Sequence, residues 1–363
     1  MYQPIRDATA WSKASFASAA AFTGNLNALQ IDDLAQCCMA IEQAGKSLQA
    51  TSLADFPLPT WQVLLEQTRG DLKDGRGFAL IRGLPVAAWG KLRTRLAVWG
   101  LGLHLGSHVS QTVDGQYICD VMDTTRGEAS PRQFRTNREL SLHTDPVSDM
   151  IGLACLSPAK QGGISVLASA ATIYNTMCER APDLLDELFR GFHVHRFGEG
   201  RPEDGEATRY RVPMLSLIDG KLDCRYVRST IVAGHKSLQR PLTQQQVAAL
   251  DLFDEIASDP DNHVSFALGE GDIVLVNNLC VLHARTGFEE HDDPARHRHL
   301  LRLWLKGRPG FRPVPGEMNY FNDGECGIPV RPGQAASYDI TQLSRADGLG
   351  RASLAAERSQ ELR

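Results

Sequence analysis

From residue 76 onward the chain is a succession of short apolar segments separated by Gly, Pro and Asp, and this pattern constrains the fold more than any other feature. Many of the segments are β-branched or alternate apolar with polar residues, which is typical of β-strands. They are Gly77–Leu84, Tyr117–Met122, Met150–Leu156, Ile164–Ala168, Phe192–Phe197, Met214–Ile218, Leu222–Val227, Val264–Leu268, Asp272–Val276 and Leu300–Leu305. Asp219-Gly220, between two of them, is a strong hairpin signal.

The predicted strands do not alternate regularly with helices, and no glycine-rich turn leads from a strand into a helix, so a parallel βαβ fold is disfavoured. We expect a mainly β protein with helical inserts, built on a jelly-roll core. Helical spacing of Leu34, Cys38 and Ile41 before Gly45 indicates an N-terminal helical region. Two further helical patterns lie between Ile173 and Leu188, broken at Pro182, and after Thr243.

These patterns predict three parts of the chain. Residues 1–75 form a helical region that packs on the core, residues 76–315 form the β domain with an insert at about 196–260, and residues 316–363 form a C-terminal extension. The length of 363 residues allows a large buried core without disulfide or metal support.

Composition excludes several classes of partner. The net charge is −5, from 38 basic and 43 acidic side chains, so we expect no general attraction to nucleic acid or to an anionic membrane. No apolar run approaches the roughly 20 residues of a membrane span. The eight cysteines contain no C-x-x-C pair, which favours a reducing, cytoplasmic location over a disulfide or zinc framework. The sequence leaves open whether the protein forms homo-oligomers, because it contains no recognisable interface pattern.

His143-Thr144-Asp145 is the first part of a candidate metal site. In an extended segment, residues two apart point the same way, so the imidazole and the carboxylate can bind one ion. By itself the pattern is weak, because about one match to His-x-Asp or His-x-Glu is expected by chance in this composition. Downstream, however, a Gly271-Asp272 strand is followed by His283 and then by two arginines, Arg298 and Arg302. Two His and one carboxylate on a β scaffold are typical of non-haem Fe(II) oxygenases.

An arginine in the same barrel could bind a dicarboxylate cosubstrate, because its guanidinium is always charged and binds a carboxylate bidentately. Together these features resemble the TauD/TfdA (taurine dioxygenase-like) and clavaminate synthase-like Fe(II)/2-oxoglutarate oxygenases, over roughly Gly77 to Pro315. The residues that carry the resemblance are Gly77–Pro85, His143-Thr144-Asp145, Gly162-Gly163, Gly271-Asp272, His283, Arg298 and Arg302.

The resemblance implies a double-stranded β-helix with iron held by His143, Asp145 and His283. It also implies that Arg302 pairs with the distal carboxylate of 2-oxoglutarate, with Arg298 near the other end. The two arginines lie on one face of a strand, so their roles are exchangeable. Ser165 matches a position where the family often has a threonine that contacts the cosubstrate.

The activity implied by the resemblance is oxidation of a substrate C–H bond by O₂, coupled to decarboxylation of 2-oxoglutarate to succinate and CO₂. Related halogenases replace the carboxylate ligand by a small residue, so the presence of Asp145 favours hydroxylation or another oxidation. The expected substrate is a small polar or anionic metabolite.

Substrate contacts are expected from the segment Asp123–Glu139, which contains Asn137, and from the insert. In the insert, Arg225 and Arg228 fall on opposite faces if Leu222–Val227 and its continuation form a strand, and we expect one of them, preferably Arg228, to bind an anionic substrate group.

Two alternatives stay open. His193, His195 and Glu199 resemble the first half of a cupin metal motif on the same barrel architecture, although the second half is not evident. A non-catalytic binding protein on the same barrel is the other alternative.

Overall fold

The computed structural model describes residues 2–124 and 136–333. Its largest sheet has seven strands, which pair in the order β1-β2-β12-β6-β15-β3, with β4 also paired to β15. All neighbours in this sheet are antiparallel except β1 and β2. The strands are β1 (Thr23–Asn25), β2 (Phe78–Arg82), β12 (Ile273–Asn277), β6 (Met150–Ser157), β15 (His299–Gly307), β3 (Gly106–His108) and β4 (Ile118–Val121).

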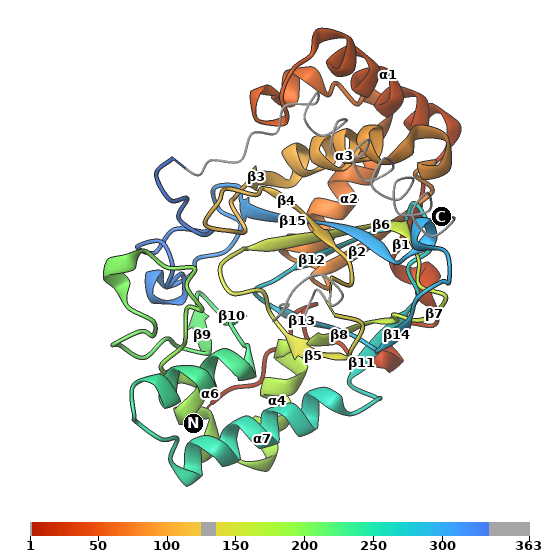
Figure 1. Cartoon of the computed structure of the whole chain (residues 1–363). Helices are drawn as coiled ribbons and strands as arrows, with labels where there is room; N and C mark the ends of the chain where they lie inside the picture. The colour runs from red at the N-terminus through yellow and green to blue at the C-terminus, as the bar shows by residue number, and fades with distance from the viewer. Residues whose placement is uncertain (1, 125–135, 334–363) are drawn as a thin grey trace.

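A smaller antiparallel sheet with the order β11-β8-β13-β5 lies below the large sheet in Figure 1. Its strands are β11 (His263–Phe266), β8 (Ser165–Ser169), β13 (Val281–Arg285) and β5 (Leu140–His143). Two hairpin-sized sheets complete the described strands and pair β9 (Leu215–Ile218) with β10 (Lys221–Cys224), and β7 (Gln161–Gly162) with β14 (Phe288–Glu289).

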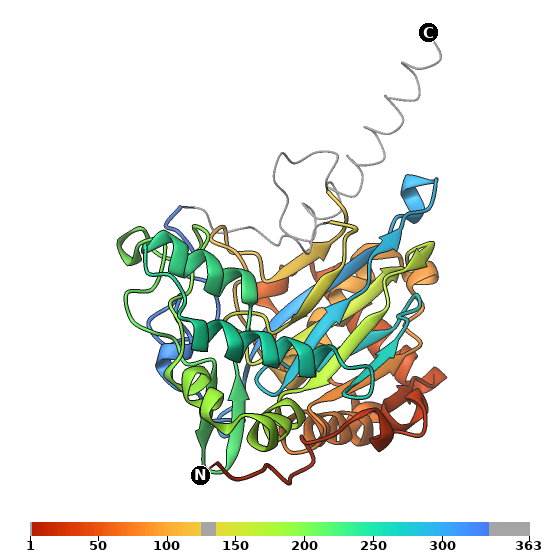
Figure 2. The same cartoon turned by 90° about the horizontal axis from the view of Figure 1, so that it is seen from below.

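Helices cover the sheets on both outer sides (Figures 1 and 2). The N-terminal group contacts the large sheet and consists of α1 (Ala28–Ala44), α2 (Gln62–Lys73) and α3 (Val86–Leu105). The second group consists of α4 (Ala170–Arg180), α5 (Pro182–Arg190), α6 (Arg228–Ser237) and α7 (Gln244–Ser258). In this group, α4 and α7 contact the smaller sheet, and α4 and α5 contact the β9–β10 pair. None of the described helices is both long enough and apolar enough to cross a bilayer.

Strand β12 is apolar at consecutive positions because both of its faces are buried. Val274 and Val276 belong to the core between the sheets and the second helix group, whereas Ile273 and Leu275 pack toward the N-terminal helices. The same alternation in β15 directs Leu301, Leu303 and Leu305 toward the helices. It leaves the alternate positions, which include Arg302 in the strand and Arg298 immediately before it, for the space between the two sheets.

The sequence predicts most of these elements correctly. Nine of the ten expected apolar segments contain a strand, and Asp219 and Gly220 both have positive φ in the turn that joins β9 to β10. Gly45 ends α1 with φ of 61°, and Thr243 caps α7 through its side chain. The long helix α3 is not predicted, because it is buried on most sides and therefore has no clear polar face.

The prediction of a strand at Phe192–Phe197 is wrong. The segment makes two isolated bridges, Phe192 to Val212 and His195 to Ala207. Phe197 then adopts a positive φ of 48°, which a continuous strand does not allow. The residues that follow β10 are also misassigned, because the chain leaves the strand at Cys224 and enters α6 at Arg228.

Candidate metal centre and active site

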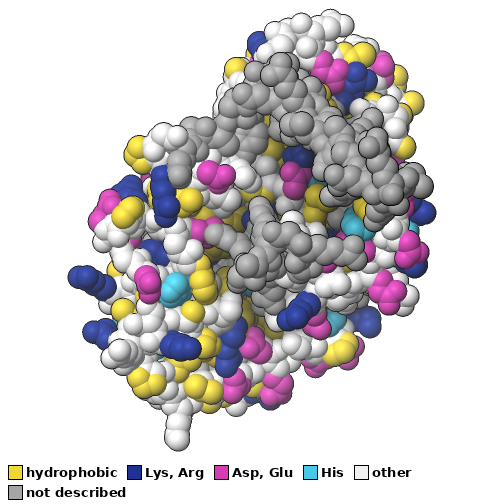
Figure 3. Space-filling model, viewed as in Figure 1, with side chains coloured by type: hydrophobic (Ala, Val, Ile, Leu, Met, Phe, Trp, Pro, Cys, Tyr) yellow, Lys and Arg dark blue, Asp and Glu magenta, His cyan; other side chains and the backbone are white. Residues whose placement is uncertain are grey.

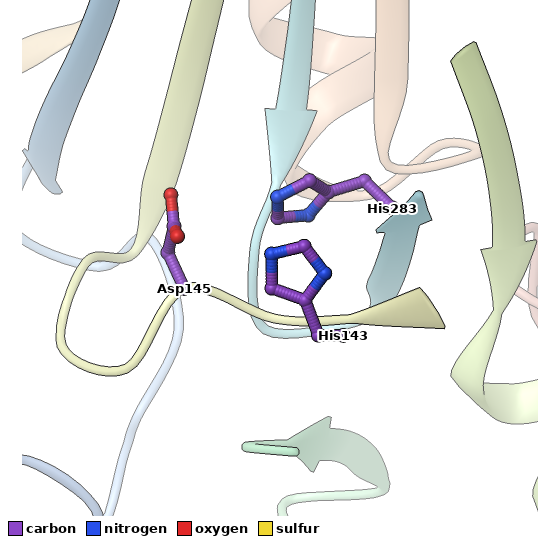
Figure 4. A group of neighbouring side chains, drawn as sticks. All are labelled: His143, Asp145 and His283. Atoms are coloured by element: carbon purple, nitrogen blue, oxygen red, sulfur yellow. The ribbon is translucent and has the colours of Figure 1, made fainter. Parts of the chain in front are cut away.

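Three side chains that the sequence analysis singled out meet between β5 and β13. The two strands pair with His143 directly opposite His283, and the imidazole centroids are 4.2 Å apart. Asp145 follows two residues after the end of β5. Possible ligand atoms of the three residues all lie within 4.8 Å of one another, and Figure 4 shows the side chains turned toward a common point. In residues 2–124 and 136–333, this is the one cluster of three or more His, Cys, Asp or Glu with such spacing.

Burial keeps the two imidazoles neutral, which is the form that binds a metal. It lowers the pKa of His283 to about 3, with a further contribution from His143, and it also lowers the pKa of His143. Nδ1 of His143 lies 2.8 Å from the carbonyl oxygen of Ser141, so a proton on Nδ1 leaves Nε2 as a lone-pair donor. Nδ1 of His283 is buried without a hydrogen-bond partner among the described residues. Two imidazoles and a carboxylate are a donor set that suits Fe(II).

Asp145 is held as an ionised carboxylate. Burial alone would raise its pKa, but Arg302, then His283 and His143, outweigh that effect and lower the pKa. The indole Nε1 of Trp304 donates to Oδ2 at 2.6 Å, and Nη1 of Arg302 lies 3.2 Å from Oδ1. The carboxylate therefore has fixed donors on the side of β15.

A cavity of about 520 Å³ adjoins the three side chains and lies between the two sheets. The polar residues of its wall include three arginines and several smaller donors and acceptors. They are Gln111, His143, Asp145, Ser165, Glu199, Ser229, Thr230, His283, Arg285, Arg298 and Arg302. The volume is in the range of pockets that bind small molecules.

Arg302 in β15 and Arg298 immediately before this strand occupy different parts of the cavity. Arg302 is next to Asp145, and its Nε donates to Oε1 of Gln111 at 2.8 Å. Arg298 instead lies against the ring of Phe288, 5.0 Å from its centroid, and next to Gly163. Burial, and then the nearby charge of Arg285, lower the pKa of Arg298 to about 10. Nη1 of Arg298 is buried with no partner in the part of the chain that the structure describes.

The expectation that Arg228 reaches the substrate is not supported. Its guanidinium pairs with Asp251 at 2.6 Å and Asp254 at 3.1 Å on α7, and it is absent from the cavity wall. The reason is that Arg228 begins a helix instead of continuing a strand. Asn137 also lies outside the wall of the cavity, and its carbonyl accepts from the N–H of Phe288. The segment Asp123–Glu139 also contains Arg126, Arg132 and Arg135, which lie outside the described residues.

Arg225 is buried behind the metal centre and does not line the large cavity. Its Nη1 donates to the carbonyl oxygens of Ser148 and Asp145, the latter at 3.3 Å, and its Nη2 donates to Asn319 at 3.2 Å. Arg225 thus supports the turn that follows Asp145.

In the described residues, His193, His195 and Glu199 do not form the metal-binding cluster that the cupin-like alternative requires. His193 Nδ1 contacts the carbonyl of Thr208 at 2.9 Å, whereas His195 Nδ1 accepts from the N–H of Phe197 at 2.9 Å. Because the strand that would have aligned the two imidazoles is not formed, they serve separate contacts. Glu199 lines the large cavity, but without either histidine.

Trp304 and Gln111, which contact Asp145 and Arg302, are among the site residues that were not identified from the sequence. Trp304 is two positions after Arg302, and the period of two in a strand was a signal that it faces the same cavity. Gln111 lies in a loop, and its side chain bridges Arg302 and the carbonyl of Tyr117. No local pattern marks Gln111 in the sequence.

Solved structures with this fold include iron-dependent oxygenases. A structure of asparagine oxygenase in complex with Fe(II), 3-hydroxyasparagine and succinate matches with a TM-score of 0.63 at 16% identity, over 78% of this chain and 93% of that one. The non-haem iron oxygenase OrfP in complex with Fe and α-ketoglutaric acid matches with a TM-score of 0.59 at 15% identity, over 84% and 99% of the two chains. At this identity, the likeness concerns the fold.

Two relatives are similar in sequence. FR-33289 synthase of Streptomyces rubellomurinus is 32% identical over 314 residues, which cover 85% of this chain and 92% of the relative. The taurine hydroxylase-like protein SAT17 of Stachybotrys chartarum is 28% identical over 313 residues, or 82% and 79% of the two chains. A family model described as taurine catabolism dioxygenase TauD, TfdA family matches residues 40–304. The chain therefore belongs to the TauD/TfdA family of dioxygenases.

Proposed function

We propose that the protein is an Fe(II)/2-oxoglutarate-dependent dioxygenase that hydroxylates, or otherwise oxidises, a C–H bond of a small polar or anionic metabolite. The observation that carries this proposal is the convergence of His143, Asp145 and His283 at one end of a cavity that also contains buried arginines. Within the family fold, we assign the two facing sheets to a double-stranded β-helix.

In this proposal the three residues bind iron on one side and leave its other positions open toward the cavity. When bound, iron and 2-oxoglutarate supply the oxidising chemistry, in which O₂, 2-oxoglutarate and a substrate C–H bond give succinate, CO₂ and a C–OH group. The protein holds the imidazoles neutral, fixes the carboxylate and shields the reacting atoms from solvent.

We assign the distal carboxylate of 2-oxoglutarate to Arg298 and Ser165, which exchanges the roles first expected for the two arginines. The support is chemical: Arg298 has a buried N–H without a described partner, whereas Arg302 is already engaged with Asp145 and Gln111. Gly163, at φ of 65°, leaves the space in which the Arg298 side chain packs. Arg302 then faces the space beside the metal, and it is the arginine best situated for an anionic substrate group.

Anaerobic spectroscopy tests the proposed function. Addition of Fe(II) and 2-oxoglutarate to the protein should produce the weak visible absorption band of the iron chelate, and His143→Ala should abolish it. A metabolite library read out by succinate formation then identifies the substrate. A wild-type protein that binds neither Fe(II) nor 2-oxoglutarate would contradict the proposal and would favour a binding protein without iron chemistry.

A further inference from the structure

Three polar side chains converge at the end of the cavity that lies farther along β13 from the metal centre. Arg285 on β13 is directly opposite Ser165 on β8, so the two side chains point to the same face of the small sheet. Arg298 reaches the same place from the position immediately before β15. The guanidinium carbons of Arg285 and Arg298 lie 4.6 Å and 5.0 Å from the centroid of the Phe288 ring. All three polar residues line the cavity.

Two donors at this end of the cavity are buried without a described partner. They are Nε of Arg285 and Nη1 of Arg298, on residues that are only 6% and 5% exposed. A buried N–H without an acceptor is costly, and a guanidinium is always charged. Asp123 and Glu290 each place a negative charge near Arg285, and Glu290 is also near Arg298. Neither carboxylate accepts from the two unpaired side-chain donors, and Oε2 of Glu290 accepts instead from the backbone N–H of Arg298 at 2.7 Å. The two unpaired donors therefore point to an anionic ligand.

The remaining contacts of Arg285 restrict how it can act. Its Nη2 donates to the carbonyl oxygens of Thr136, at 2.9 Å, and Arg138, just before β5. These bonds hold the guanidinium in place and leave Nε as the donor that lacks a partner. Arg285 is also two residues after His283 on the same face of β13, which separates their Cα atoms by roughly 6.6 Å. This separation is on the scale of a five-carbon diacid that chelates the metal at its other end.

We propose that Arg285 is a second guanidinium for the distal carboxylate of 2-oxoglutarate, which it binds together with Arg298 and Ser165. This inference rests on the proposed function and extends it. A carboxylate has acceptor positions for all three donors. Arg285 would also connect the bound cosubstrate to the segment 136–138 that leads into β5 and His143.

The test compares two 2-oxo acids of equal length. 2-Oxoglutarate has a distal carboxylate, and 2-oxovalerate has a methyl group in its place. Only 2-oxoglutarate should therefore make a direct ionic contact with Arg285. Each is titrated anaerobically into the Fe(II)-loaded protein, and binding is followed by the visible band of the chelate. Arg285→Gln should weaken 2-oxoglutarate binding at least tenfold and change 2-oxovalerate binding by less than about threefold. Arg285→Lys should have an intermediate effect, since it keeps the charge.

Arg76→Gln is a matched control, because Arg76 also donates to backbone carbonyls, those of Phe78 and Ala21, but lies outside the cavity. It should leave both affinities unchanged. Equal weakening of both acids in Arg285→Gln, or no weakening of either, would overturn the inference.

If 2-oxovalerate binds the wild type too weakly to titrate, the inference is tested by measuring the affinity of Arg285→Gln for Fe(II) beside its affinity for 2-oxoglutarate. Unchanged Fe(II) affinity with lost 2-oxoglutarate affinity supports the inference, and a parallel loss of both overturns it. Failure of the proposed function has a different signature, because the wild-type protein would then show no band with 2-oxoglutarate.

Discussion

The side-chain amide of Asn278 binds both backbone groups of Asp145. Its Oδ1 accepts from the N–H of Asp145 at 2.7 Å, and its Nδ2 donates to the carbonyl oxygen of Asp145 at 2.7 Å. Nδ2 also donates to the carbonyl of Ser148 at 2.8 Å. All of these groups are buried, so the hydrogen bonds are formed away from competing water. Asn278 therefore fixes the position of the carboxylate without touching the metal site itself.

Replacement of Asn278 by alanine should lower the affinity for Fe(II) by roughly 10- to 100-fold, because the backbone that carries the Asp145 ligand loses its support. Fe(II) binding is measured anaerobically by calorimetry. Asn277→Ala is the matched control: Asn277 is equally buried and bonds to backbone groups of Leu72 and Leu279, away from the metal residues. It should lower stability without a comparable loss of metal affinity. Equal metal affinities of the two variants would refute the role of Asn278.

Arg298, immediately before β15, and Arg302, within it, should differ in their effect on the cosubstrate. At saturating Fe(II), Arg298→Gln should weaken 2-oxoglutarate binding roughly 10- to 100-fold, because a charged hydrogen bond to the distal carboxylate is lost. Arg302→Gln should change this binding much less and should instead raise the KM of the organic substrate, once that is identified. Anaerobic titration of the chelate band measures the first effect. The reverse order of the two variants would restore Arg302 as the cosubstrate residue.

Arg228→Ala should leave turnover and cosubstrate affinity unchanged. Its ion pairs with Asp251 and Asp254 are at the surface, where such pairs contribute up to about 1 kcal/mol to the free energy of unfolding. Urea denaturation should detect this small loss, and a succinate assay should detect none. A large fall in kcat/KM in a folded Arg228→Ala protein would show that the residue reaches the substrate after all.

Asp120 makes stability depend on pH in the acid range. Burial raises its pKa, but the hydrogen bond from His299 and the charge of Arg95 outweigh burial and lower it to about 2. Since an unfolded aspartate titrates near 4, the contribution of this carboxylate is complete above about pH 5 and is lost as the pH falls toward 2. Asp120→Asn should cost roughly 1–2 kcal/mol at pH 7, less than a fully buried pair because the side chain is 43% exposed. In urea denaturation, the difference from wild type should shrink between pH 4 and pH 2; a constant difference would exclude this linkage.

Much of the architecture could be predicted from the sequence, because it depends on the local pattern of apolar and polar residues. The strands β2, β6, β12 and β15 are recognisable from apolar segments, and α1 and α7 from helical spacing and their end residues. The candidate ligands His143, Asp145 and His283 were identified from their spacing relative to two arginines and from a family resemblance. Figure 3 is in keeping with the modest net charge, because acidic and basic side chains are interspersed over the face that it shows.

The predictions that failed depended on where a strand ends. His193 and His195 share a face only in a regular extended strand, whereas the chain there makes two isolated bridges, at Phe192 and at His195. Arg228 was expected on a strand but begins α6, where its charge is satisfied by α7. In both cases the backbone conformation was predicted wrongly, because a short segment adopts the conformation that its tertiary contacts favour.

The amino-acid order alone determined that the chain is a β-rich protein with His143, Asp145 and His283 as candidate ligands, because periodicity and motif spacing are properties of the sequence. Only the tertiary structure decided which arginine lies beside Asp145, that Asn278 supports it, and that Arg285 joins Arg298 and Ser165. Those relations depend on how β8, β13 and β15 are placed across a shared cavity, and the packing of residues far apart in the chain determines that placement.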